Sequence, residues 1–301
     1  MWPSWRSRVP LRSLLPGLAA LIALPGAALA SEPTVRSWDQ SFTVGEHPRV
    51  HVNSDDARVV VHTGASGHVE FQVHYSDHRW GFTSPPREPH VNMTQNGDEV
   101  TLSVRQPTIF ALFGVVDTRL EVNVILPATC DLLISSGDGS VTLEQPVEGH
   151  VEISTGDGRI VAHGTRGDMS FHSGDGAVVG DSLDGTLAVR CGDGHVQLSG
   201  RFDRIEEKSG DGRVEITAEK GSRMRDDWSI ETSDGPLTVR IPQDLQAELD
   251  AHAGDGVIRF QLPVSLSEQL DRHTIRGLIN GGGPLLRLRT GDGTLTLAAS
   301  D

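Results

Sequence analysis

The chain has 301 residues, of which 41 are acidic and 26 are basic, so its formal net charge at neutral pH is −15. This charge excludes nucleic acid as the expected partner, because proteins neutralise phosphates with Lys and Arg. It also disfavours docking on anionic lipid headgroups. The 34 glycines, together with frequent Val, Thr and Ser, indicate short strands joined by tight turns, and therefore an all-β fold.

Residues 1–30 are predicted to be a secretory signal peptide. Arg6, Arg8 and Arg12 precede the apolar stretch Leu14–Leu29, and residues 28–30 form a small-x-small cleavage site. An uncleaved membrane anchor is the alternative, but prolines and glycines interrupt the stretch. No cysteine follows the cleavage site to carry a lipid, and no later run is long enough to span a membrane. We therefore expect export to the periplasm, the cell surface or the medium.

Residues 31–127 are expected to form a β-rich N-terminal region that includes a cap for the repeats that follow. The segment Ser54–Ala57 resembles a degenerate first turn of those repeats. Four segments alternate between apolar and polar residues as half-buried strands do: Arg58–His62, Val69–His74, Val100–Val104 and Leu120–Leu126.

The segment Gln106–Asp117 is irregular and apolar, and it includes Ile109, Phe110, Leu112 and Phe113. Its expected role is to cover the open end of the repeat stack. The alternative is an exposed apolar patch that binds a partner, and these four residues are then the candidate partner-binding residues.

Residues 128–301 repeat a Gly-Asp-Gly phrase that is followed by alternating apolar residues. The central aspartates are Asp138, Asp157, Asp175, Asp193, Asp211, Asp234, Asp255 and Asp292. The first five are 18 or 19 residues apart, which is typical of a solenoid with one phrase per coil. The last step, 37 residues, is expected to hold two coils, the first of them turning at Asn280–Gly283.

Four positions in each repeat are apolar: those six and four residues before the aspartate, and those three and five residues after it. Only Glu207 and Gly180 depart from this pattern among the 32 positions. Alternation at i and i+2 predicts strands with one buried face. We therefore expect a single-stranded β-solenoid, similar to a β-helix or β-roll, with about 18 residues and two short strands per coil.

The solenoid places its aspartates in a ladder about 4.8 Å apart. Two carboxylates at that distance repel each other by about 0.9 kcal/mol even in water. A row of oxygen ligands suits Ca²⁺, so the candidate metal ligands are Asp138, Asp157, Asp175, Asp193, Asp211 and Asp255. Turn formation explains the same residues without a metal, because Gly and Asp are the residues that tight turns prefer. We therefore expect no cofactor, with a calcium-stabilised β-roll as an alternative.

The position three residues before the aspartate carries His172, Arg190 and Lys208 on successive coils. These side chains are expected to point outward, where they balance the charge of the acidic surface. The alternative is a stripe that binds an anionic glycan.

The two cysteines, Cys130 and Cys191, are expected to be free thiols. Their aspartates are three coils apart, which separates the cysteines by about 14 Å along the axis. A disulfide requires Cα atoms within about 7 Å.

Signatures of hydrolases, metalloproteases and phosphate-binding loops are missing from the sequence. The enzymatic alternative is a polysaccharide-active β-helix, because the ladder offers many carboxylate pairs. All of those pairs share one environment, however, whereas an acid and a base need two different environments. We therefore expect no catalytic residues.

The repeated Ser/Thr-Gly-Asp-Gly-x-Val-x-Leu units, together with Ile125–Pro127 before the first coil and Ile279–Pro284 before the last, resemble the bacterial adhesin-like β-solenoid family of the DUF4097 type, a domain of unknown function. The resemblance covers residues 45–300 approximately. It implies a β-solenoid of the cell envelope without established catalysis, and it brings no catalytic residues. We expect an exported, non-enzymatic binding or scaffold protein whose partner is an envelope protein or glycan.

Overall fold

The computed structural model describes residues 34–300 except 86, 109–110, 263–267 and 270–271. The predicted signal peptide and the candidate residues Ile109 and Phe110 lie outside the described residues. The described part consists of strands and their connections, so the all-β prediction is confirmed. It contains no helix that could cross a membrane.

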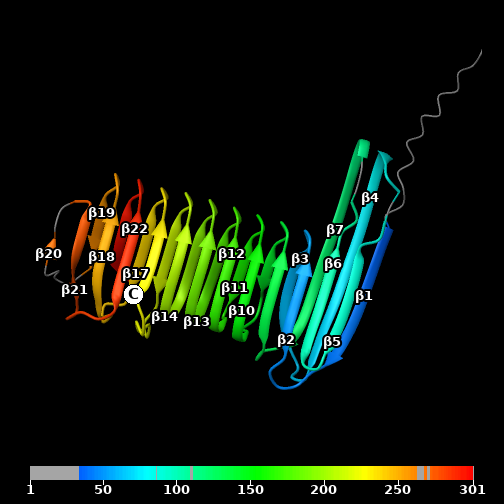
Figure 1. Cartoon of the computed structure of the whole chain (residues 1–301), viewed down its shortest axis with the longest axis horizontal. Coiled ribbons are helices and arrows are strands. Elements are labelled where there is room, and N and C mark those ends of the chain that lie inside the picture. The colour runs from blue at the N-terminus through cyan, green and yellow to red at the C-terminus, as the bar shows by residue number, and fades with distance from the viewer. Residues whose placement is uncertain (1–33, 86, 109–110, 263–267, 270–271, 301) are drawn as a thin grey trace, which may run out of the picture.

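The strands form one long stack with two faces (Figure 1). On the first face lie, in spatial order, β5 (His90–Asn96), β6 (Glu99–Arg105), β2 (Arg49–Ser54), β8 (Asp131–Ser136), β10 (Glu148–Thr155), β12 (Arg166–Ser173), the second halves of β13 (Val178–Cys191) and β14 (Val196–Ser209), β16 (Trp228–Thr232), β22 (Leu285–Thr290), β18 (Ala247–Ala253), β21 (Thr274–Ile279) and β20 (Glu268–Gln269).

The second face lies opposite the first. Its strands are β1 (Thr34–Thr43), β4 (His68–Thr83), β7 (Ala111–Pro127), β3 (Arg58–Gly64), β9 (Val141–Leu143), β11 (Ile160–His163), the first halves of β13 and β14, β15 (Val214–Ala218), β17 (Leu237–Ile241), β23 (Leu295–Ala299) and β19 (Ile258–Gln261).

Parallel pairing joins residues 18 positions apart through the middle of the stack. Val151 pairs with Met169, Met169 with Leu187, and Leu187 with Ile205. All four side chains are buried between the two faces. Stacking therefore gathers equivalent apolar residues into continuous columns, and each coil buries its faces only against its neighbours.

The predicted core positions are buried, with a departure at the C-terminal end. There Ile258 and Phe260 of β19 are only half-buried, because their coil has a neighbour on one side only. Gly180 interrupts its apolar column. The buried side chain of Leu183 fills the space that a side chain at position 180 would occupy. A Cβ atom at Gly180 would lie 3.0 Å from both Leu183 and Leu198.

Spatial order departs from chain order at both ends of the stack. β2 lies between β6 and β8, and β3 lies between β7 and β9. At the other end, β22 lies between β16 and β18, and β23 lies between β17 and β19. The last coil of the sequence (β22–β23, residues 285–299, named here the C-terminal coil) is thus inserted between two coils that precede it.

This arrangement corrects the expectation that the 37-residue step holds two successive coils. β21 runs antiparallel to β18 at the outer edge, and is not a coil of the parallel stack. The chain then reverses at Asn280, Gly281 and Gly282, which all have positive φ, and β22 enters on the inner side of β18. Asn and Gly tolerate that backbone conformation better than other residues, which explains their place at this reversal.

Candidate functional site

The aspartate of each turn binds the backbone of the next coil. The N–H of Asp138 donates to Oδ1 of Asp56 at 3.0 Å, and the N–H of Asp157 donates to Oδ1 of Asp138 at 3.2 Å. Equivalent bonds of 3.3 to 3.4 Å continue through Asp175, Asp193 and Asp211. Ser54–Ala57 therefore is the first turn of the ladder, as the sequence predicted.

Hydroxyl groups complete the turns on their inner side. Thr155 Oγ1 donates to the carbonyl of Gly137 at 2.8 Å, and Thr232 Oγ1 donates to that of Gly210 at 2.8 Å. Together with the carboxylates and with backbone bonds between successive turns, such as that from the N–H of Gly156 to the carbonyl of Gly137 at 2.6 Å, these groups satisfy the backbone of each turn. The Ser/Thr-Gly-Asp-Gly phrase thus has a complete structural explanation.

The ladder follows the spatial order of the coils. Oδ1 of Asp234 lies 2.7 Å from where a Cβ atom of Gly291 would be, and the N–H of Asp255 donates to the carbonyl of Gly291 at 3.2 Å. Asp292 therefore lies between Asp234 and Asp255. In the described residues, no group of three or more His, Cys, Asp or Glu side chains converges on one point. Calcium binding by the ladder stays a prediction.

The cationic column lies on the first face, as expected from the register. His172 pairs with Arg190, and Arg190 pairs with Lys208, on three neighbouring strands. All three side chains are exposed. They line a shallow groove of ≈ 430 Å³, to which Glu152 and Glu206 also contribute. The groove mixes both signs of charge, so it is not a purely cationic stripe.

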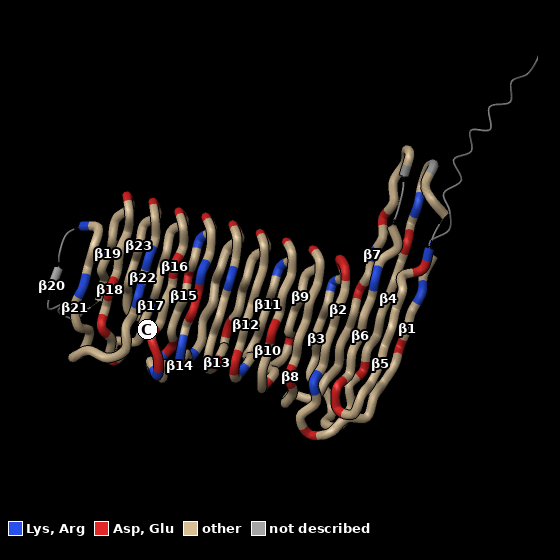
Figure 2. The backbone as a smooth tube through the Cα atoms, viewed as in Figure 1, with Lys and Arg blue, Asp and Glu red and all other residues tan. Residues whose placement is uncertain are grey.

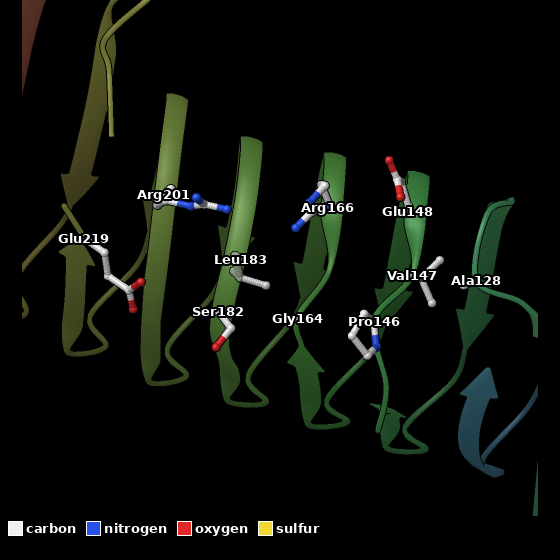
Figure 3. Close-up of a pocket in the computed structure, with 10 residues that line it drawn as sticks. All are labelled: Ala128, Pro146, Val147, Glu148, Gly164, Arg166, Ser182, Leu183, Arg201 and Glu219. Atoms are coloured by element: carbon white, nitrogen blue, oxygen red, sulfur yellow. The ribbon is translucent and has the colours of Figure 1, made fainter. Parts of the chain in front are cut away.

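A second groove, of ≈ 520 Å³, crosses the loops that connect the two faces (Figure 3). Glu148, Arg166, Asp184 and Arg201 lie in register on four successive strands beside it. Asp184 accepts an ion pair from Arg166 at 3.4 Å and another from Arg201. Alternating charges pair along the stack, so their role here is to hold neighbouring coils together.

The sequence analysis missed this charge ladder. Glu148, Arg166 and Asp184 each precede the aspartate of their turn by nine residues, so the column is visible in the sequence. The expectations above rest on the apolar columns and on the position three residues before the aspartate, however, and this charged column is neither. Arg201 shifts the spacing by one residue, where the pairing of β13 with β14 changes register.

β4 and β7 extend beyond the stack as a two-stranded ribbon (Figure 1). β1 pairs with β4 only as far as Asp77, and β3 pairs with β7 only from Glu121 onward. We name the two-stranded part, residues 78–83 with residues 111–117, the arm. Within the described residues its strands pair with each other alone, so no described strand covers either edge of the ribbon.

Large apolar side chains are exposed on the arm. Trp80 pairs with Val115, and Phe113 lies two residues before Val115 on the same side of β7. The exposed fractions are 49% for Trp80, 74% for Leu112, 56% for Phe113 and 61% for Val115. We name these four residues the tip cluster. The cap predicted for Gln106–Asp117 is wrong for Leu112 and Phe113, because they project from the stack instead of covering its end.

A buried ion pair holds the foot of the arm. Arg79 donates from Nε to both oxygens of Asp77, at 2.7 and 2.8 Å, and from Nη1 to the carbonyl of Ser84. The hydroxyl of Tyr75 donates to the same carboxylate at 3.0 Å. The bond to Asp77 raises the pKa of Arg79, and burial raises the pKa of Tyr75. The pair therefore ties the loop after β4 to the arm.

Two facing glycines shape the arm within the tip cluster, between the pair of Trp80 with Val115 and Phe113. Gly81 pairs with Gly114, and their φ angles are 104° and 128°. A Cβ atom on Gly114 would lie 2.0 Å from the carbonyl oxygen of Trp80. Larger residues cannot occupy this position without moving the opposite strand.

Glu207 is the only described acid that lies in an apolar column of the core. It is 1% exposed and pairs with Val189 and Ile230 on the neighbouring strands. Its carboxylate accepts no hydrogen bond of good geometry from the described residues. Burial raises its pKa to about 8, against smaller opposing effects of Ser209 and of the Glu231 backbone. The residue faces the core and not a groove, so it is placed to affect stability.

The two cysteines are free and buried in the structure. Burial raises the pKa of Cys130 to about 12, and it also raises the pKa of Cys191. Both are therefore neutral thiols at physiological pH, and the thiolate form that reacts with oxidants and metals is scarce.

Stacked coils, a ladder of aspartate turns and strands that close both ends define the chain as a β-solenoid. The family model Toastrack DUF4097 matches residues 48–298. The chain belongs to this family, as its repeats suggested.

A solved structure supports the same fold. The chain is similar to a "putative lipid binding protein" from Parabacteroides distasonis, with 11% identity, 87% of this chain and 96% of that chain covered, and a TM-score of 0.52. It is also similar to a "putative adhesin" from Bacteroides fragilis, with 13% identity, 88% and 97% coverage, and a TM-score of 0.41. No curated protein matches the chain.

Proposed function

We propose that this chain is an exported, non-enzymatic binding or scaffold protein of the bacterial cell envelope, with an adhesin-like role. The observation that carries the proposal is the arm. It exposes four large apolar side chains on a ribbon that projects from the stack. Exposed apolar patches on a folded protein mark surfaces that bind a partner.

The two grooves support a role without catalysis. Beside one groove, residues of opposite charge are paired in register, as Arg201 is with Asp184, and the other groove carries both Arg190 and Glu206. Glycoside hydrolysis requires two carboxyl groups in different environments on either side of a substrate. The buried acids among the described residues are Glu207, which lies in the core, and Asp77, which is bound to Arg79, and neither lines either of these two grooves.

The N-terminal sequence supports export. Basic residues, an apolar stretch and a cleavage site after Ala30 are the parts of a secretory signal. The protein is then folded outside the cytoplasm, where envelope proteins, glycans and lipids are the available partners.

Co-sedimentation with isolated envelopes tests the proposal. We expect the purified protein from residue 31 onward to sediment with envelope fragments. A variant with the tip cluster replaced (W80S, L112S, F113S and V115S) should remain in solution. The matched control replaces two exposed apolar residues at the other end of the stack, V257S and L278S, and should sediment like the parent protein.

Two results would contradict the proposal. One is that the folded protein stays in solution and sediments with none of the envelope fractions. The other is release of sugars from envelope polysaccharide by the purified protein, which would favour the enzymatic alternative. Mass spectrometry of the exported protein tests cleavage after Ala30.

A further inference from the structure

We propose that the arm docks on a lipid bilayer and inserts the tip cluster into the interfacial layer of the membrane. This inference rests on the proposed function, because it names the partner of the same surface.

The composition of the arm fits a membrane interface. The tip cluster combines Trp80 and Phe113 with the aliphatic Leu112 and Val115, all about half or more exposed. Trp is enriched where membranes meet water, because its ring is apolar and its N–H is polar. Trp80 and Val115 are opposite each other in the ribbon, so the same outward side carries an aromatic and an aliphatic group.

The charge of the arm also fits a membrane. Residues 80–83 and 111–116 contain no charged residue, and the ends of β4 and β7 in Figure 2 lack the colours of charged residues. Below them, Arg79 is paired with Asp77, and Arg119 is paired with Asp117 at 3.3 Å. The arm is thus locally neutral although the chain carries −15. It can approach a zwitterionic surface without electrostatic repulsion.

The shape of the arm favours a bilayer over a second copy of the chain. A projecting apolar tip would need an apolar groove on a protein partner. Both grooves described above carry charged residues among their apolar ones, Glu148 and Arg201 in one and Arg190 and Glu206 in the other. A second copy therefore offers no uncharged apolar groove there. A bilayer accepts apolar side chains without a preformed pocket.

The start of the described chain lies at the same place. Thr34 pairs with Asp77, three residues before Trp80 on β4. The apolar stretch Leu14–Leu29 ends five residues before Thr34, and five residues of extended chain reach about 17 Å at most. Until it is cleaved, a membrane-bound signal segment would therefore hold the foot of the arm close to the bilayer.

The open edges of the ribbon limit the depth of insertion. Beyond Asp77 and Glu121 no strand of the described residues pairs with the outer edges of the arm. Unpaired backbone groups are very unfavourable in the hydrocarbon core but are hydrated at the interface. The arm is therefore suited to shallow insertion and not to spanning.

Flotation with phosphatidylcholine vesicles tests this inference, using the protein from residue 31 onward. We expect it to float with the vesicles, and high salt should change this little, since the contact is apolar. The quadruple tip variant (W80S, L112S, F113S and V115S) should lose more than about tenfold in partitioning. The V257S and L278S control should float like the parent. Circular dichroism checks that each variant is folded.

Tryptophan fluorescence gives an independent measurement. Of the three described tryptophans, Trp228 is buried, Trp38 is half-buried and Trp80 is the exposed one. Vesicles should shift the emission to the blue, and the W80F variant should float without that shift.

Three outcomes would overturn the inference. The first is a folded parent protein that does not float, or a tip variant that floats as well as the parent. The second is a dimer, measured by light scattering, that the tip variant disrupts while vesicles have no effect. The third is sedimentation with envelopes but no binding to lipid vesicles, which would leave the proposed function intact and assign the arm a protein or glycan partner.

Discussion

The backbone N–H of Asp157 donates to the carboxylate of Asp138 on the preceding coil, at 3.2 Å. The same bond joins Asp175 to Asp157. Each aspartate from Asp138 to Asp193 therefore binds the next turn of the stack and is itself bound through its own N–H. This relationship gives the Gly-Asp-Gly phrase a role between coils as well as within one turn.

Removing the acceptor at Asp157 should destabilise the stack. In D157A the N–H of Asp175 loses its partner, and we expect a loss of about 1 kcal/mol in the free energy of unfolding. D157N keeps an oxygen acceptor and removes one charge of the ladder, so its stability should be close to that of the parent. Urea denaturation measures both, and equal losses in the two variants would contradict a role for the bond.

The same ladder predicts the response to calcium. The carboxylates already accept backbone N–H groups, so we expect the melting temperature to be the same with calcium and with a chelator. A rise in melting temperature with calcium that D157N abolishes would instead support the calcium-stabilised β-roll.

Glu207 should make stability depend on pH. Its pKa is raised by burial from 4.5 to about 8 in the folded chain. Both states bind the proton below pH 4.5, where the folded state is favoured most. As the pH rises from 4.5 to 8, the unfolded chain releases the proton and the folded chain does not. Stability should fall over this window by a few kcal/mol at most.

Glu207→Leu tests this dependence. The variant places an apolar residue in an apolar column, and it should be more stable than the parent above neutral pH and lack the decline. Glu206→Gln is the matched control, because Glu206 is exposed and its neighbour on the same strand. Denaturation curves at several pH values would refute the assignment if the decline survived in the Leu variant.

The C-terminal coil should be more sensitive to mutation than the coil at the physical end of the stack. Leu286 is fully buried, with Trp228 on one side and Leu249 on the other. Leu286→Ala should cost about 2–5 kcal/mol. Ile258→Ala should cost less, because Ile258 is half-buried and has a neighbouring coil on one side only. Equal losses would contradict the inserted position of the C-terminal coil.

The buried thiols should be protected in the native protein. Cys130 and Cys191 are buried and free, with raised pKa values. We expect an aromatic disulfide reagent to react slowly in buffer and to find two thiols per chain in denaturant without reductant. A chain that shows none in denaturant would contain a disulfide that the stack does not accommodate.

The repeat columns could be predicted because their cause is local. Every coil must present apolar side chains to the same two neighbours, so Val151, Met169 and Leu187 appear at a fixed spacing. The order of the coils could not be predicted in the same way. The repeats around Asp234, Asp255 and Asp292 have the same apolar pattern, so each could stack on either of the others. The pattern within a repeat does not determine which coils are neighbours.

The arm shows a different limit of sequence reasoning. An apolar segment near Leu112 and Phe113 is compatible with a covered end or with an exposed tip, because hydrophobicity alone does not state what lies against a side chain. The pairing that decides the matter, Trp80 with Val115, joins residues 35 positions apart. This pairing follows from the complete register of β4 and β7 and not from the sequence of either strand alone.

The inserted position of the C-terminal coil has a consequence for how such a protein can grow and fold. A solenoid whose last coil is also its outermost could lengthen by adding repeats at its C-terminus. Here both ends are interleaved, so new repeats fit only in the middle, between β8 and β16. As the chain folds, the gap between β16 and β18 must stay open until β22 enters it. The C-terminal coil therefore completes the stack from within.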